Sequence, residues 1–296
     1  MEVSVLNTNK NDKIKGALYG FAIGDAMGAT TEFMTKEQIK AKFGLITDIQ
    51  GGGWLNLKPG QVTDDTQMMI CVIKAIMSSA HHIEDLTYID ENEFVENCKK
   101  NFIEWYKSNP PDVGNRCRHS IELLMQGKDI PIANDALGNG SLMRALPCAL
   151  INNIRLNILQ SKLTHNNIIC SDIIQSFSKN IFYNINNKSY HHDRRFLEEP
   201  SGHVLNTYNN AEYYYLHYNF KDGIIKAVND GGDADTIAAI AGALLGSFYG
   251  FHEIPQKWVE VLDDEVKEVL DRFSSWLSIY SSLTQSNIKE VGGWLS

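Results

Sequence analysis

The sequence lacks any closely spaced pair of cysteines. Its five cysteines are odd in number and far apart, and no C-x-x-C motif occurs. This distribution weighs against a disulfide framework and against a zinc site, and it is typical of proteins from a reducing compartment. We therefore expect a cytoplasmic protein.

Long hydrophobic runs and an excess of basic residues are also missing. The uncharged stretch 236–251 is shorter than the roughly 20 residues that a membrane-spanning helix needs, so we expect no membrane partner. Residues 16–24 follow two lysines as in a signal peptide, but Asp25 ends the apolar run at once. The formal net charge of −9 disfavours a protein that binds a nucleic-acid backbone through a basic stripe.

Neither alternating strands nor βαβ units, linkers or internal repeats are found. The hydrophobic content of 43% is ordinary for a globular protein, and 296 residues suffice for a large core. We predict an all-α fold in a single compact domain over residues 1–296. Helical spacing of apolar residues predicts helices over 12–29, 66–80, 92–107, 117–127, 141–151, 166–180, 203–218, 220–229, 236–250 and 256–283. We expect loops at 109–114 and 183–201, and either a loop or a short hairpin at 45–62.

Small residues recur every four positions in two of the predicted helices, so each set lies on one face. The sets are Gly16, Gly20, Gly24 and Gly28 in one helix, and Ala238, Gly242, Gly246 and Gly250 in the other. A glycine within a helix costs about 1 kcal/mol relative to alanine, which is tolerated where another backbone must approach closely. We predict that helices 12–29 and 236–250 pack against each other. The alternative is that each face packs against a different helix.

An acidic cluster precedes the apolar helix at 66–80. This first acidic cluster, Thr63-Asp64-Asp65-Thr66, places two carboxylates and two hydroxyls within four residues. Such oxygens are the ligands that hard divalent cations prefer. Threonine and aspartate are also favoured as helix caps, although one acid would serve that purpose. Capping and metal binding therefore both remain open for this cluster.

A second acidic cluster, Asp233-Ala234-Asp235-Thr236, precedes the other glycine-rich helix. That helix is apolar nearly all round, which indicates burial. Its N-terminus would place two carboxylates near the core, where unpaired charge is expensive. A metal ion is the natural neutraliser, and the alternative is a basic partner such as Arg144.

Three further sites are weaker candidates. Glu32 follows the first glycine-rich helix and becomes available to the same region if the two helices pack; the alternative is a solvated surface acid. The segment 138–141 (Gly-Asn-Gly-Ser) precedes a helix and could bind a phosphate or ribose through backbone N–H groups. His165 follows Thr164, and a single histidine in such a place is usually structural.

In this order, these segments resemble the ADP-ribosylglycohydrolase family, which includes the dinitrogenase reductase-activating glycohydrolases. The resemblance extends over residues 12–250, and the two acidic clusters with the glycine-rich helix are its most specific part. The matching segments are Gly16–Gly28, Glu32–Phe33, Pro59–Gly60, Thr63–Thr66, Pro111–Asn115, Gly138–Arg144, Thr164–His165 and Gly231–Thr236.

The resemblance implies an orthogonal helical domain around a binuclear Mg²⁺ centre, with Mn²⁺ as a substitute. The implied metal ligands are Thr63, Asp64, Asp65, Asp233, Asp235 and Thr236. The implied catalytic residues are Glu32, Asp65 and Asp233, and the implied substrate-binding residues are Asp112, Asn139, Gly140, Ser141 and His165. The implied reaction is hydrolysis of the glycosidic bond at ribose C1″ of an ADP-ribosylated protein, with release of ADP-ribose and arginine as the favoured acceptor.

Other functions stay open at this point. Within the family, the substrate could be a serine-linked, O-acyl or nucleic-acid-linked ADP-ribose conjugate. Outside it, the chain could be an ADP-ribose-binding module without activity or an unrelated di-metal phosphoesterase. The full set of implied ligands together with Glu32 disfavours the binding module. We expect a monomer.

Overall fold

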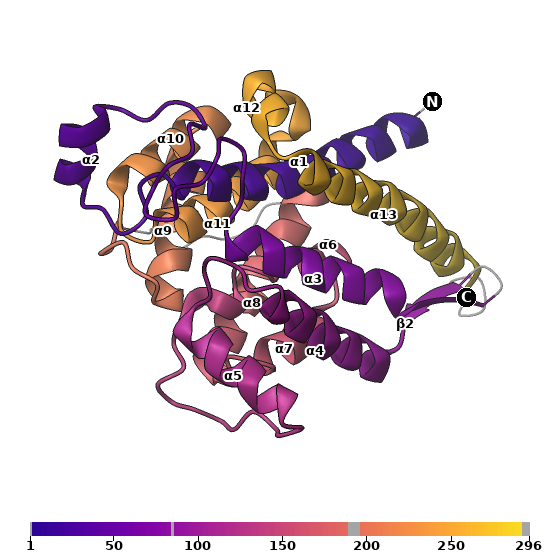
Figure 1. The fold of residues 1–296 in the computed structure, drawn as a ribbon. Helices are drawn as coiled ribbons and strands as arrows, with labels where there is room; N and C mark the ends of the chain where they lie inside the picture. The colour runs from indigo at the N-terminus through magenta and orange to yellow at the C-terminus, as the bar shows by residue number, and fades with distance from the viewer. Residues whose placement is uncertain (1, 84–85, 189–195, 292–296) are drawn as a thin grey trace.

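The computed structural model of the protein describes residues 2–83, 86–188 and 196–291. These residues are mostly helical, which confirms the predicted fold class; the division into a single domain stays a prediction (Figure 1). In chain order the elements are α1 (Glu2–Gly28), α2 (Lys36–Phe43), α3 (Asp64–Ser78), β1 (Ala80–Ile83), β2 (Leu86–Ile89), α4 (Glu91–Lys107), α5 (Asn115–Met125), η1 (Asn139–Ser141), α6 (Leu146–Leu150), α7 (Ile154–Lys162), α8 (Ile168–Ile185), α9 (Val204–His217), α10 (Phe220–Asp230), α11 (Ala234–Tyr249), η2 (Phe251–Glu253), α12 (Gln256–Val261) and α13 (Asp264–Val291).

Helices α1 and α11 pack directly against each other, as the glycine spacing predicts. A Cβ atom on Gly20 would lie 2.2 Å from the carbonyl oxygen of Gly242, and a Cβ on Gly242 would lie 2.0 Å from that of Gly20. At the other end of the pair, a Cβ on Gly28 would lie 2.5 Å from the Ala234 oxygen. The helices run antiparallel, so the end of α1 meets the start of α11.

Two predicted helices are interrupted in the structure. The prediction of one helix over 141–151 is wrong: the short 3₁₀ turn η1 is followed by a break before α6. Pro147 lies in the first turn of α6, where its missing N–H is harmless. The predicted helix 256–283 is divided into α12 and α13. Leu262 is extended there (ψ 144°), and the Asp263 carboxylate accepts the Glu265 N–H at 2.9 Å, which starts a new helix.

Helices α2 and α7, the short turn η2 and the strands β1 and β2 were not predicted. Helix α2 buries a single side chain, Ile39, so its apolar periodicity is weak, although Thr35 and Gln38 form a capping box before it. Strands β1 and β2 form an antiparallel hairpin. The predicted loop at 183–201 is partly wrong, because α8 continues to Ile185, and residues 189–195 lie outside the described residues.

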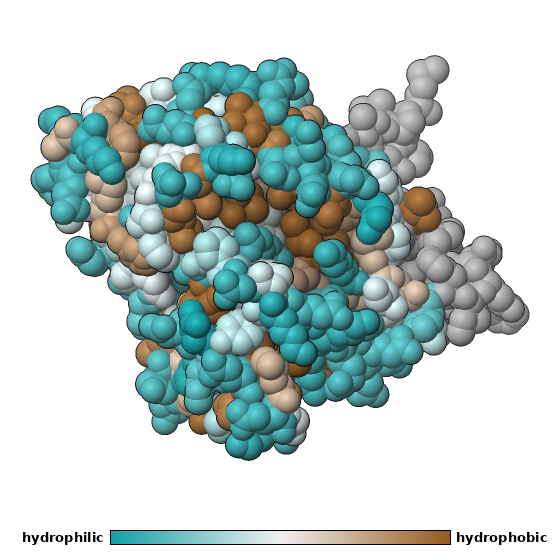
Figure 2. All heavy atoms as spheres, in the orientation of Figure 1, coloured by the Kyte–Doolittle hydropathy of each residue, from teal (hydrophilic) through white to brown (hydrophobic). Residues whose placement is uncertain are grey.

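The face shown in Figure 2 is largely hydrophilic, with apolar side chains gathered in a band across its middle. Part of this band is the groove between α3 and α13, which is lined by Val62, Ile70, Val266 and Val269 among others. Among the helices of the described chain, none is long and apolar enough to cross a membrane.

Candidate metal and ligand site

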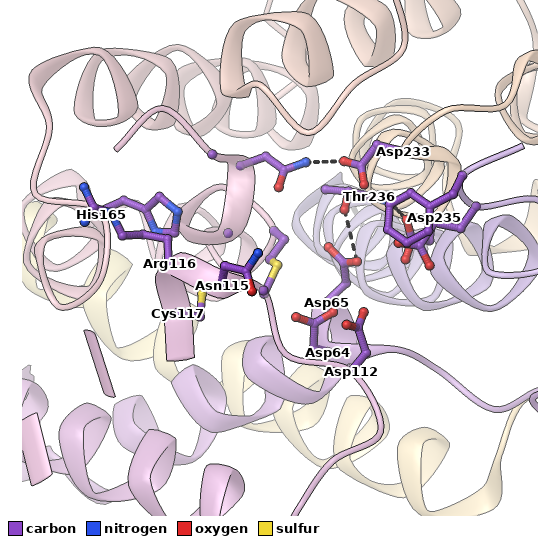
Figure 3. A pocket seen from close by; sticks show the side chains of 17 residues that line it. Asp64, Asp65, Asp112, Asn115, Arg116, Cys117, His165, Asp233, Asp235 and Thr236 are labelled. Carbon is purple, nitrogen blue, oxygen red and sulfur yellow. Dashed lines mark hydrogen bonds between the residues drawn. The ribbon is translucent and has the colours of Figure 1, made fainter. Parts of the chain in front are cut away.

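A pocket lies where the end of α1 and the N-termini of α3, α5 and α11 meet (Figure 3). It brings together most of the residues that the sequence singled out: Glu32, Asp64, Asp65, Asp112, Asn139, Gly140, His165, Asp233, Asp235 and Thr236. Two candidates, Thr63 and Ser141, are buried beside the pocket but do not line it.

The two acidic clusters are in direct contact, although 171 residues separate Asp65 from Thr236. The Thr236 hydroxyl donates to Asp65 Oδ2 at 3.2 Å (Figure 3), and the Thr63 hydroxyl donates to the same oxygen at 3.1 Å. The packing of α1 on α11 places the second cluster here, and α3 carries the first. The predicted meeting of the clusters is therefore confirmed.

The two interpretations of the first acidic cluster concern different residues, and the capping interpretation is confirmed for Thr63. Thr63 is the N-cap of α3, and its hydroxyl accepts the Asp65 N–H at 3.3 Å. Asp64 and Asp65 occupy the first helical turn, and both line the pocket. Helix capping thus accounts for the threonine and leaves the two carboxylates available to a ligand.

Asp25 is a site residue that the sequence reasoning missed. It is fully buried in α1, and its carboxylate accepts the backbone N–H groups of Thr63 and Thr66, both at 3.0 Å, and the Thr66 hydroxyl at 2.5 Å. It therefore ties α1 to the start of α3. The available signal is an acid within the otherwise uncharged stretch 16–29.

Buried carboxylates crowd one side of the pocket. Burial, reinforced by neighbouring negative charges, raises the pKa of Asp64, Asp65 and Asp235 well above the ordinary value. Burial likewise raises the pKa of Glu32 to about 8 and that of Asp233 to about 6. Such a cluster is unfavourable unless protons or a cation neutralise it.

The donor set fits divalent cations. Oxygens of Asp25, Asp65 and Asp235 lie within 4.8 Å of one another, and so do oxygens of Glu32, Asp233 and Asp235. The two groups share Asp235. Asp65 Oδ1 is buried and finds no hydrogen-bond partner in the described part of the chain. A cation would supply that partner, and the carboxylate oxygens suit a hard metal.

Arg144 does not neutralise the acids, so that alternative is wrong. Its buried guanidinium donates to Gln160, Thr164 and the Gly140 carbonyl, on the other side of the pocket. The only contact from that side to the second acidic cluster that we find in the described residues is neutral: the Asn139 amide donates to Asp233 Oδ2 (Figure 3).

The loop 45–62 reaches the pocket through Trp54. Its indole Nε1–H donates to Glu32 Oε2 at 2.6 Å, and the Thr30 hydroxyl holds the loop at the Gly51 carbonyl at 3.0 Å. Phe33 lies beside Trp54, with ring centroids 5.6 Å apart, and is 68% exposed. Glu32 is therefore buried and held by a hydrogen bond, which excludes a freely solvated surface acid.

Comparison with known proteins identifies relatives over most of the chain. The family model described as ADP-ribosylglycohydrolase matches residues 6–177 and 185–287. The ADP-ribosyl-[dinitrogen reductase] glycohydrolase of Rhodospirillum rubrum is 35% identical, covering 88% of this chain and 94% of the relative. The ADP-ribosylarginine hydrolase Tri1 of Serratia proteamaculans (strain 568) is 28% identical, covering 85% and 75%.

A solved structure has the same fold. The chain titled "ADP-ribosylglycohydrolase-related protein complex" superposes with a TM-score of 0.75 at 24% identity, covering 93% of this chain and 99% of the other. At that level of identity the likeness concerns the fold alone. The fold and the sequence relatives nevertheless agree over nearly the full length.

Proposed function

Because the chain belongs to the ADP-ribosylglycohydrolase family and is a hydrolase, we propose that it cleaves the glycosidic bond at ribose C1″ of an ADP-ribosylated protein, releasing ADP-ribose. The observation that carries this proposal is the union of the two acidic clusters in one pocket. Arginine is the favoured acceptor, because two relatives are named ADP-ribosylarginine hydrolases. The Asp112 carboxylate in the pocket wall also suits a guanidinium.

The proposed metal ligands are the carboxylates and hydroxyls of the two clusters, and we add Asp25 as a supporting or direct ligand. The proposed set from the clusters is Thr63, Asp64, Asp65, Asp233, Asp235 and Thr236. Two Mg²⁺ ions, or Mn²⁺ in their place, would orient the ribose diol and lower the pKa of a bound water when present. The fit rests on the crowded carboxylates and on Asp65 Oδ1, which has no hydrogen-bond partner among the described residues.

Glu32 is the proposed proton-transfer residue. A pKa of about 8 allows its carboxyl to exchange a proton near neutral pH. Trp54 Nε1–H fixes one of its oxygens, so the other is directed to the substrate or a water. As general base it would deprotonate the water, and as general acid it would protonate the leaving group. Glu32→Gln should abolish turnover and leave ADP-ribose binding intact; full activity would exclude both roles.

On the remaining side of the pocket, we propose that Asn139, Gly140, Ser141 and His165 bind the ADP-ribose. Asp65 and Asp233 act in catalysis by holding the metals. We also propose that the protein is a monomer. A cytoplasmic location is proposed because all five cysteines are free and buried, which suits a reducing compartment.

One substrate panel tests the proposal. Arginine-, serine- and DNA-linked ADP-ribose are incubated with the protein in Mg²⁺ or EDTA, and the product is identified by mass. We expect release of ADP-ribose from the arginine conjugate in Mg²⁺ and none in EDTA. Release of AMP or ribose phosphate would identify a phosphoesterase instead. Binding without release from any conjugate would identify a binding module.

A further inference from the structure

Arg144 is a buried cation without a carboxylate partner among the described residues. Its Nε donates to the Gln160 side chain at 2.7 Å, Nη2 to the Gln160 carbonyl at 2.9 Å, and Nη1 to the Gly140 carbonyl at 3.0 Å. The guanidinium also lies 4.5 Å from the centre of the Phe102 ring. Among the described residues, neutral acceptors alone therefore stabilise this charge.

The Thr164 hydroxyl connects the Arg144 guanidinium to His165 by hydrogen bonds. Arg144 Nη2 also donates to Thr164 Oγ1 at 2.7 Å, and the same oxygen lies 2.8 Å from His165 Nδ1. A guanidinium only donates, so the threonine oxygen is the acceptor in the first bond. The hydroxyl proton is then free to point at the ring nitrogen. The Cys117 thiol also lies beside Thr164, but sulfur is a weaker acceptor than an imidazole nitrogen.

We propose that Arg144 and Thr164 are positioning residues that hold His165 in its neutral Nε2–H tautomer. His165 then serves the pocket as a permanent hydrogen-bond donor to a ligand oxygen and takes no part in proton transfer. A ring nitrogen that accepts a hydrogen bond cannot carry the proton, so the partner of Nδ1 decides the state of Nε2. Which oxygen receives the bond rests on the proposed function, whereas the tautomer does not.

The other ring nitrogen lies beside the glycine backbone of the turn at η1. A Cβ on Gly138 would lie 3.1 Å from His165 Nε2, and a Cβ on Gly140 would lie 2.8 Å from Cε1. These glycines and His165 all line the pocket. The bare backbone of the turn therefore leaves Nε2–H room to meet a ligand.

The electrostatic surroundings keep the imidazole neutral. Burial, with the positive charges of Arg144 and Arg116, lowers the pKa of His165 to about 3. Two thiols lie nearby, Cys117 in α5 and Cys170 in α8, and burial raises the pKa of each to about 11. The pocket carboxylates lie on the opposite side from His165 (Figure 3). No carboxylate of the described chain is hydrogen-bonded to either ring nitrogen.

The tautomer can be measured directly in the full-length protein. Long-range ¹H–¹⁵N correlation spectra distinguish a protonated from a bare ring nitrogen, and loss of one signal set in His165→Gln assigns it. We expect Nε2 protonated and Nδ1 bare at every pH between about 5 and 8, the range over which a free histidine titrates. An Nδ1–H tautomer or an imidazolium in this range would refute the proposal.

Variants of Thr164 test the positioning role. Thr164→Val keeps the shape and removes the hydroxyl; we expect mixed tautomers and ADP-ribose binding weakened about 10-fold, with KM affected more than kcat. Thr164→Ser should restore both. Ser120→Ala is the matched control, because Ser120 donates to the Thr164 carbonyl at 3.0 Å without touching the hydroxyl.

The outcomes separate this proposal from the proposed function. Unchanged tautomer and affinity in Thr164→Val would refute the positioning role. If that variant fails to fold, the wild-type spectrum and Thr164→Ser still decide the matter. If the wild type shows the expected tautomer but neither binds nor releases ADP-ribose, the proposed function fails and the tautomer assignment stands.

Discussion

The two sides of the pocket bury charge in opposite ways. On the side of α1, α3 and α11, carboxylates face one another, and one oxygen of Asp65 has no partner among the described residues. On the side of η1 and α7, Arg144 is equally buried, yet neutral acceptors meet its N–H groups. A buried charge with its hydrogen bonds satisfied is part of the scaffold. A buried charge without them calls for a ligand from outside.

The largest expected effect is on the acidic side. Asp65→Asn removes a central carboxylate, and we expect turnover to fall by on the order of 10³-fold, with weakened metal binding by calorimetry. The metal-free variant should be at least as stable as the wild type, because one unpaired buried charge is gone. Asp172→Asn, at an exposed acid of α8, is the control. Strong destabilisation of metal-free Asp65→Asn would contradict the comparison.

On the opposite side, removing the charge should do the reverse. Arg144→Met orphans the acceptors on Gln160, Thr164 and Gly140, so we expect a loss of about 3 kcal/mol in the free energy of unfolding. Urea titration followed by circular dichroism measures this loss. Arg155→Met, which breaks only an exposed ion pair with Glu91, should cost about 0.5 kcal/mol. Equal effects in the two variants would show that Arg144 is not part of the scaffold.

His165 gives the neutral side a pH signature. Its folded pKa of about 3 lies below the ordinary 6.5, so the unfolded chain takes up the proton first. The stability due to neutral His165 is fully present above pH 6.5 and is lost as the pH falls toward 3. When the pH falls from about 7 to 5, the free energy of unfolding of His165→Gln should decrease by about 2 kcal/mol less than that of the wild type.

Unfolding titrations at the two pH values measure this difference, and His119→Gln, at an exposed histidine, supplies the control. The two proteins are compared by how their free energy of unfolding changes with pH, since loss of the bond to Thr164 lowers that free energy equally at both pH values. Parallel pH profiles for His165→Gln and the wild type would show that the histidine takes up its proton in the folded protein as readily as in the unfolded chain.

The smallest expected effect concerns the link between the loop and the acids. Trp54→Phe keeps an aromatic ring beside Phe33 and removes the N–H that holds Glu32. We expect kcat to fall about 10-fold, the equivalent of one hydrogen bond to a charged group, with a shifted pH–rate profile. Trp105→Phe, which loses a bond to Gln67 away from the pocket, is the control. An unchanged profile would mean that Trp54 does not orient Glu32.

Sequence patterns were most informative where they act over a few residues. The four-residue spacing of glycines predicted the contact of α1 with α11, and the resemblance implied that the two acidic clusters share one site. The family resemblance added the residues that are expected to bind the substrate. The helix break at Leu262 and the strands β1 and β2 were not predicted because each signal extends over only a few residues.

Long-range contacts were out of reach. Asp25 acts by capping α3 from α1, which depends on how two helices cross. Trp54 reaches Glu32 only because the loop folds back on Gly51, and the alternative that Arg144 pairs with the second acidic cluster fails because its acceptors come from other segments. In each case the residue type was visible, while its partner was fixed by tertiary structure.

The contact between α1 and α11 has a consequence for how the protein can vary. Where Gly20 meets Gly242, backbone touches backbone, so van der Waals contact between the two backbones sets the distance between the helices, and side-chain rotamers do not. The positions of Asp25 and Asp235 are inherited from that distance. Rearrangement of side chains cannot change this distance, whereas one methyl group added to either glycine must increase it. New specificity is therefore expected to arise in the loops around the pocket, while the packing of α1 against α11 stays unchanged.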